Sequence, residues 1–161
     1  DLPQEIHWRR KMTTVYDVPA DLLIEKVADK LQKIETIQEP EWAPFVKTGV
    51  HKEKAPLNEG WWYTSEAAIL RQVYLHGPIG STHLRAKFCG PKDRGVKPQR
   101  VSLGSGSIVR TALKQLEEAG LVLTVKGKGR EVTPKGRSFL DNTAYEVLQD
   151  IIKERPELGK Y

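Results

Sequence analysis

The chain has 161 residues, of which 39% are hydrophobic, and a formal net charge of +5. This length and apolar content suit one folded domain and exclude a wholly disordered chain. The single cysteine excludes an internal disulfide and a cysteine zinc site. No apolar run approaches the ~20 residues that span a bilayer, and no secretory signal follows the N-terminus, so we expect a cytoplasmic protein without membrane contact.

Residues 1–11 show no periodicity, and we interpret them as a flexible extension before a single domain over residues 12–161. The basic residues 9–11 suit either a small nucleic-acid arm or a disordered tail. A first helix is predicted from Pro19, with Asp17 as its N-cap, to about Glu35. Its apolar stripe consists of Leu22, Leu23, Val27, Leu31 and Ile34.

Residues 36–60 are rich in proline and glycine and predict a loop, with a basic edge at Lys47, Lys52 and Lys54. We expect Trp42 and Phe45 to anchor this loop to the core. Residues 61–76 predict a helix that Gly77 ends. Its inward-facing residues are expected to be Ala67, Leu70, Val73 and Tyr74.

A short helix is predicted over 81–88, with Ser81 as its cap. The glycines and prolines of 90–98 predict a loop, which carries Lys92, Arg94 and Lys97 and is followed by Arg100. Either Ser105 or Ser107 is expected to cap a third helix that runs through Ala119. The buried stripe of that helix is predicted to contain Ile108, Ala112, Leu116 and Ala119.

Residues 121–125 and 130–133 predict two short strands around the glycine turn at 126–129. A last helix is expected to start at Pro134 with Thr133 as its cap, and to bury Phe139, Leu140, Ala144, Val147, Leu148 and Ile151. Three helices followed by a hairpin is the order of a winged helix-turn-helix. The predicted fold is therefore mainly α: a winged helix with a small β-hairpin wing and additional N- and C-terminal helices.

The sequence has no constellation typical of an enzyme, a cofactor site or a metal site. The four histidines are scattered, and no phosphate-binding lysine loop or nucleophile elbow is present. Residues 104–107 (GSGS) are interpreted as a flexible lead-in to the third helix, because no glycine-lysine pair accompanies them. Cys89 is expected to be a packed thiol.

Positive charge is concentrated in one part of the chain. Residues 84–137 contain 13 Lys and Arg against 4 Asp and Glu, whereas the rest has 13 against 17. This segregation predicts a polyanionic partner. On the third helix Arg110 and Lys114 share a face, and Lys126, Lys128 and Arg130 are predicted at the hairpin tip. The pattern alone leaves DNA and RNA open and favours a DNA-binding regulator.

Several motifs resemble the nineteen-e family of small-subunit ribosomal proteins of archaea and eukaryotes, over about residues 12–161. They are PEW at 40–42, VKTGVHKEKAP at 46–56, WWYTSEAAILRQVYLHGPIG at 61–80, the broken loop at 90–98, GSGSIVRTALKQLEEAGLV at 104–122 and GKGREVTPKG at 127–136. The segment ETIQEPEWAPFVKTG, at 35–49, is more similar to archaeal members than to eukaryotic ones.

The resemblance implies a non-enzymatic protein in the head of the small subunit that binds its ribosomal RNA, lies among other small-subunit proteins and supports late RNA maturation near the 3′ region. Arg71, Arg110, Lys126, Lys128 and Arg130 match basic positions of the family, and Trp61 matches a tryptophan that packs. Ser65-Glu66 stands where relatives tend to have an arginine, and Phe88-Cys89-Gly90 replaces a tyrosine and two glycines.

The sequence thus predicts an RNA-binding surface, and it leaves one alternative function open. The predicted RNA-contacting residues are Lys52, Lys54, Arg71, Lys92, Arg94, Lys97, Arg100, Arg110, Lys114, Lys126, Lys128 and Arg130. The alternative is a winged-helix DNA-binding transcription regulator that dimerises through its last helix. We expect no cofactor, metal or small-molecule substrate.

Overall fold

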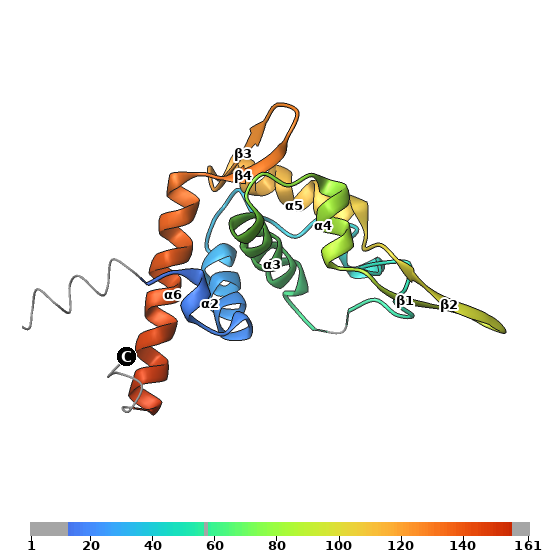
Figure 1. Cartoon of the computed structure of the whole chain (residues 1–161), viewed down its shortest axis with the longest axis horizontal. Coiled ribbons are helices and arrows are strands. Elements are labelled where there is room, and N and C mark those ends of the chain that lie inside the picture. Colours follow the sequence, from blue (N-terminus) through green and yellow to red (C-terminus); the bar gives the residue numbers. More distant parts are fainter. Residues whose placement is uncertain (1–12, 57, 156–161) are drawn as a thin grey trace, which may run out of the picture.

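Helix α3 (Trp61–His76) lies in the middle of the molecule, between the N-terminal and C-terminal helices and the rest of the chain (Figure 1). The computed structural model describes residues 13–56 and 58–155, so the predicted extension at 1–11 lies outside the described residues. Within this part of the chain the fold is mainly α, as the sequence predicts, and it has two antiparallel hairpins where one was predicted. In chain order the other elements are η1 (Val15–Asp17), α2 (Ala20–Gln32), η2 (Ala43–Phe45), α4 (Ser81–Lys87), β1 (Gly90–Arg94), β2 (Lys97–Ser102), α5 (Gly106–Glu118), β3 (Val122–Val125), β4 (Gly129–Val132) and α6 (Pro134–Glu154).

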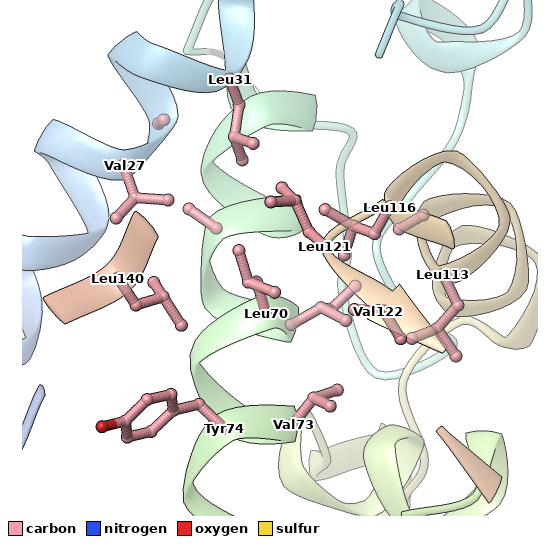
Figure 2. Packing of buried hydrophobic residues seen from close by; sticks show 14 of the residues in the cluster. Val27, Leu31, Leu70, Val73, Tyr74, Leu113, Leu116, Leu121, Val122 and Leu140 are labelled. Carbon is pink, nitrogen blue, oxygen red and sulfur yellow. The ribbon is translucent and has the colours of Figure 1, made fainter. Parts of the chain in front are cut away.

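The hydrophobic core joins all five described α-helices. Figure 2 shows side chains of α2, α3, α5, β3 and α6 pointing toward one another, among them Leu31, Leu70, Leu116, Val122 and Leu140. All of these are fully or almost fully buried. Burial of an aliphatic side chain stabilises the fold by about 1.5–3 kcal/mol. This core holds the helices in fixed positions beneath the surface described below.

Helix α2 is confirmed, with different ends from those predicted. Its N-cap is Pro19, and Asp17 instead closes η1, where its carboxylate accepts a hydrogen bond from the Thr14 N–H at 2.8 Å. The helix ends at Gln32, three residues before Glu35. Leu22 was wrongly placed on the buried stripe, since 44% of its side chain is exposed.

Helix α6 is confirmed with Thr133 as its cap and Pro134 in its first turn; the Thr133 hydroxyl accepts from the Gly136 N–H at 3.0 Å. It packs along α2, and Lys26 and Lys30 pair with Asp150 and Glu146 across this contact. The positive charges on this side of the molecule are therefore partly neutralised within the protein.

The long loop between α2 and α3 is confirmed apart from the short helix η2. Trp42 anchors it as predicted, because its ring lies edge-on against that of Trp62 with 5.7 Å between centroids. The same prediction for Phe45 was wrong, since its side chain is 84% exposed. Of the two aromatic residues, Trp42 anchors the loop and Phe45 is presented to solvent.

Residues 90–98 were predicted as a loop, and this prediction was wrong. They belong to a hairpin of β1 and β2 that projects from the body of the molecule (Figure 1). Gly95, which was expected to break regular structure, instead forms the turn between β1 and β2 and has a φ of +75°. Ser81 was also wrongly named as the cap of α4, because the N-cap position is occupied by Gly80, which has no side chain to cap with.

The predicted order of α3, α4, α5 and a hairpin is present. Strands β3 and β4 pair in register from Val122↔Val132 to Val125↔Gly129. Arg130 of β4 also exchanges two backbone hydrogen bonds of 2.9 Å with Ile79, in the segment between α3 and α4. These bonds fix the position of the β3–β4 hairpin relative to the helices.

The start of α6 packs so closely on Leu121, in the segment between α5 and β3, that it requires glycine. A Cβ on Gly136 would lie 2.2 Å from the Leu121 carbonyl oxygen. We expect Gly136→Ala to lower the free energy of unfolding by about 1–3 kcal/mol through overpacking. Urea denaturation checks this, with the exposed Ser138→Ala as control; equal stability of the two variants would contradict the packing described.

No helix in the described part of the chain combines the length and apolarity needed to cross a membrane.

Candidate nucleic-acid interface

The β1–β2 hairpin, residues 90–102, is a two-stranded ribbon with a basic face. Lys92 lies opposite Arg100, and Arg94 lies opposite Lys97. Lys92 and Arg94 alternate on β1 and so share a face, and directly opposed residues share it with them. The register shift between the two pairs absorbs the odd spacing of Lys97 and Arg100 on β2, so all four side chains lie on one face. Asp93, Pro91 and Val101 lie on the other. The ribbon thus presents its four cations together and keeps its one acid apart from them.

This basic face is not neutralised by the rest of the described protein. Among the described residues none of the four cations forms an ion pair, whereas Lys26 and Lys30 on α2 do. Residues 95–101 are all exposed, and Val96 at the turn is fully so. An unpaired cationic surface that projects into solvent is suited to contact phosphates.

At its root the ribbon packs on the loop at 48–52. The Lys92 ammonium donates to the Val50 carbonyl at 2.9 Å. The His51 ring lies between Gly49 and Gly90, since a Cβ on either glycine would come within 2.7 Å of it. Burial, followed by the charges of Lys52 and Lys92, lowers the pKa of His51. The imidazole at this junction is therefore mostly uncharged at neutral pH.

Beside His51 the protein has a cavity of about 320 Å³, which we call the root pocket. Its floor is apolar and buried, and comes from Ile69, Ile108 and Val109. Half-buried residues form its walls: Thr48, His51, Ser65, Phe88 and Ser105. Lys52 and Cys89 are exposed at its mouth. Cys89 was predicted as a packed thiol, and its exposure shows that this was wrong.

A second, more open hollow of about 580 Å³ adjoins the root pocket, since Ser105 lines both. It brings Lys47 of the loop next to Arg110 of α5, together with the partly buried Trp42. On α5, Arg110 and Lys114 are exposed and share the face opposite the buried stripe, as predicted. The loop, the ribbon and α5 therefore contribute to one continuous surface.

Four of the predicted contact residues lie elsewhere: Lys126, Lys128, Arg130 and Arg71. Lys126 and Lys128 are exposed at the tip of β3–β4, away from the ribbon (Figure 1). Arg130 is not at that tip: it is half-buried in β4, and its guanidinium lies 3.8 Å from Glu117. Arg71 is half-buried on a different side of α3 from Ser65 and Ile69, given 100° of rotation per residue. Lys54 is exposed in the loop.

Ser65 and Glu66 have different surroundings although they are adjacent. Ser65 lines the root pocket, whereas Glu66 is completely buried in α3. Burial raises the pKa of Glu66 to about 8, an effect that the neighbouring Trp62 partly opposes. The Trp62 Nε1–H donates to Gln115 at 3.1 Å, and neither carboxylate oxygen of Glu66 has a hydrogen-bond partner among the described residues. Glu66 is therefore mostly protonated at pH 7 and is not part of the surface.

The segment at 104–107, predicted as a flexible lead-in, is tied down. Gly104 is buried and donates to the Arg85 carbonyl at 3.1 Å, and the Ser105 N–H donates to Thr48 at 2.9 Å. Ser105, of the two serines considered, caps α5 by accepting from the Ile108 N–H at 3.4 Å. This segment therefore fixes the loop at 48–52 against α5, which shapes the root pocket.

No cluster of three or more potential metal-ligating side chains occurs in the described residues. The ribbon and the root pocket were not predicted from the sequence. Asp93-Arg94-Gly95 between two basic runs was the available signal for a turn, and the Asp93 carboxylate indeed accepts from the Gly95 N–H at 2.9 Å. Pro91 and Pro98 argued against strands on either side of this turn, since proline in a strand is confined to exposed edges.

The chain is similar to known proteins along most of its length. The family model described as ribosomal protein S19e matches residues 14–150. A protein of Aeropyrum pernix named small ribosomal subunit protein eS19 is 47% identical over 93% of this chain and 99% of its own length. Its namesake from Haloarcula marismortui is 44% identical with the same coverage, and small ribosomal subunit protein eS19G of Ascaris suum is 38% identical over 87% of this chain and 95% of its own. The chain therefore belongs to the ribosomal protein S19e family, whose members are structural proteins and not enzymes.

Proposed function

We propose that this protein is a structural component of the small ribosomal subunit that binds small-subunit ribosomal RNA in the head region and supports RNA maturation and subunit assembly. The observation that carries the RNA-binding part is the basic ribbon face of Lys92, Arg94, Lys97 and Arg100, which no described residue neutralises. Membership of a ribosomal protein family supports the ribosomal part. Other small-subunit proteins are then its neighbours, and its location is the cytoplasm.

The proposed mechanism is electrostatic and positional. Each lysine or arginine that contacts a phosphate releases condensed counterions, which favours binding most at low salt. The core keeps α5 in a fixed position, and the Ser105–Thr48 hydrogen bond holds the loop at 48–52 against it, so Lys52, Arg110 and Lys114 are presented in one arrangement. The exposed tip of β3–β4 adds Lys126 and Lys128 as a separate contact, and Lys54, Arg71 and Arg130 complete the proposed set.

The fold we propose for this function is a winged helix within one domain over residues 12–161. Its support is the order α3, α4, α5 and β3–β4, with α4 packed on α5 and the hairpin tied to Ile79. The single hydrophobic core to which every described helix contributes supports one domain.

A DNA-binding regulator that dimerises through α6 is the second candidate, favoured only by the helix and hairpin order. The apolar face of α6 is occupied by α2 and the core: Leu140, Ala144 and Val147 are at most 3% exposed. A dimer through that face would have to displace α2.

Direct binding separates the two candidates. We expect the purified chain to bind a small-subunit rRNA transcript at least about tenfold more tightly than a DNA duplex of equal length at about 0.15 M salt, and to remain a monomer in light scattering. Filter binding at several salt concentrations measures both affinities. A stable dimer with tight and sequence-specific duplex binding would instead establish the regulator.

A further inference from the structure

We propose that the root pocket binds the base of one unpaired nucleotide, whose flanking phosphates lie on the basic face of the ribbon. This inference rests on the proposed RNA binding and names the kind of RNA element that the site takes: a single-stranded or bulged nucleotide. Proteins that recognise RNA usually bind unstacked bases in this way, because the grooves of the A-form helix give little access to base edges.

The chemistry of the cavity matches an aromatic heterocycle. Its volume of about 320 Å³ is at the lower end of the range for small-molecule sites. Ile69, Ile108 and Val109 give it an apolar floor that a base ring could cover. The hydroxyls of Ser65, Thr48 and Ser105 stand above that floor and can donate to or accept from base edges.

The charges around the pocket favour a nucleotide over an apolar side chain of another protein. Lys52 lies at the mouth, and the ribbon's basic face begins there, because Gly90 and Lys92 of that face contact His51 and Val50. Asp93, the ribbon's acid, is on the opposite face and is bonded to its own turn. An apolar cavity bordered by unpaired cations is complementary to a base that carries a phosphate on either side.

The cavity is also held in shape before any ligand arrives. The Gly104 and Ser105 amides tie its α5 edge to Arg85 and Thr48, and Lys92 ties the ribbon root to Val50. A site that needs little ordering on binding loses less conformational entropy.

A pair of adjacent substitutions on α3 tests the proposal. Ser65→Phe places a ring in the pocket, whereas Thr64→Phe adds the same ring at an exposed neighbour that does not line it. Stacking of one base contributes enough that we expect Ser65→Phe to weaken binding to a small-subunit rRNA transcript about tenfold. The slope of log Kd against log salt should not change, because no phosphate contact is lost. Thr64→Phe should stay within about twofold of the wild type.

The sole cysteine gives an independent readout on the unaltered sequence. Cys89 is exposed at the pocket mouth, so bound RNA should slow its alkylation by N-ethylmaleimide, and prior alkylation should weaken RNA binding as Ser65→Phe does. Alkylation of Cys89 tests whether RNA occupies the root pocket even if Ser65→Phe does not fold. The control is a double variant, Cys89→Ser with Ser138→Cys, which carries the same adduct at an exposed position of α6 away from the pocket.

The outcomes of these experiments distinguish failure of the pocket proposal from failure of the proposed function. If the wild type binds rRNA but Ser65→Phe and alkylated Cys89 bind equally well, the pocket proposal is wrong and the proposed function stands. If the wild type binds no rRNA, the proposed function fails and the pocket proposal fails with it. Protection of Cys89 in assembled subunits by a cross-linkable protein side chain, with none by free rRNA, would also overturn the base-binding proposal.

Discussion

Replacement of Arg94, Lys97 and Arg100 by glutamine is expected to weaken binding to small-subunit rRNA on the order of tenfold to 100-fold near 0.1 M salt. Each phosphate contact that is lost lowers the slope of log Kd against log salt by about 0.7–0.9, so the triple change should lower it by about 2–3. Lys92 is left in place because its bond to the Val50 carbonyl holds the loop. Filter binding at several salt concentrations measures both quantities.

The matched control removes three positive charges outside the ribbon, α5 and the loop at 48–52. Lys33, Lys153 and Arg155 are exposed at or after the ends of α2 and α6. Their replacement by glutamine lowers the net charge by the same amount but removes no ribbon cation, so it should change the slope by less than about one. Since the ribbon side chains are mostly exposed, both triple variants should keep their free energy of unfolding to within about 0.5 kcal/mol per substitution. Equal loss of affinity in the two would show that only net charge matters and that the ribbon is not the contact surface.

Glu66→Gln is expected to stabilise the protein at pH 8.5 and to have little effect at pH 5. In the folded protein burial raises the pKa of Glu66 from 4.5 to about 8. Between these two values the folded state holds a proton that the unfolded state has lost, so stability falls as the pH rises, by about 1.4 kcal/mol per pH unit. Above pH 8 the full penalty of a buried charge is present. The variant carries no such charge, and should therefore be more stable at pH 8.5 by about 4–5 kcal/mol.

Urea denaturation of both proteins at pH 5 and pH 8.5 measures this effect, because other titrating groups contribute equally to the wild type and the variant. Glu118→Gln, at an exposed position of α5, is the control and should show no such dependence on pH. A Glu66→Gln protein whose stability differs from the wild type by the same amount at both pH values would show that Glu66 is not a buried neutral acid.

The helices were predictable because their signals are local. Apolar periodicity, the Thr133-Pro134 start of α6 and the positive-φ Gly77 at the end of α3 all act within one or two turns. The predictions of burial were wrong where contacts between residues far apart in the sequence determine which side chains reach the core. Leu22 lies on the predicted stripe of α2 but is exposed, since α3 and α6 pack against a narrower set of residues. Trp42, and not the nearby Phe45, packs next to Trp62, and the sequence does not show which of the two aromatics reaches the core.

The candidate site was predictable as a set of charges but not as a shape. The concentration of cations over residues 84–137 is visible in the sequence, and so are Arg110 and Lys114 on one helix face. Which cations share the ribbon face depends on the register of β1 with β2, and the register shift between Lys92 and Arg94 has no sequence signature. The root pocket depends on His51 lying between two glycines that are far apart in the chain, Gly49 and Gly90.

We propose that this chain is a constituent of the small ribosomal subunit. Sedimentation of a native lysate through a sucrose gradient, with the chain detected in each fraction, tests it most directly. We expect the chain to migrate with small subunits and to remain there in moderate salt, since several basic elements are proposed to contact the RNA. Its absence from the small-subunit fractions, with the free chain at the top of the gradient, would contradict the claim.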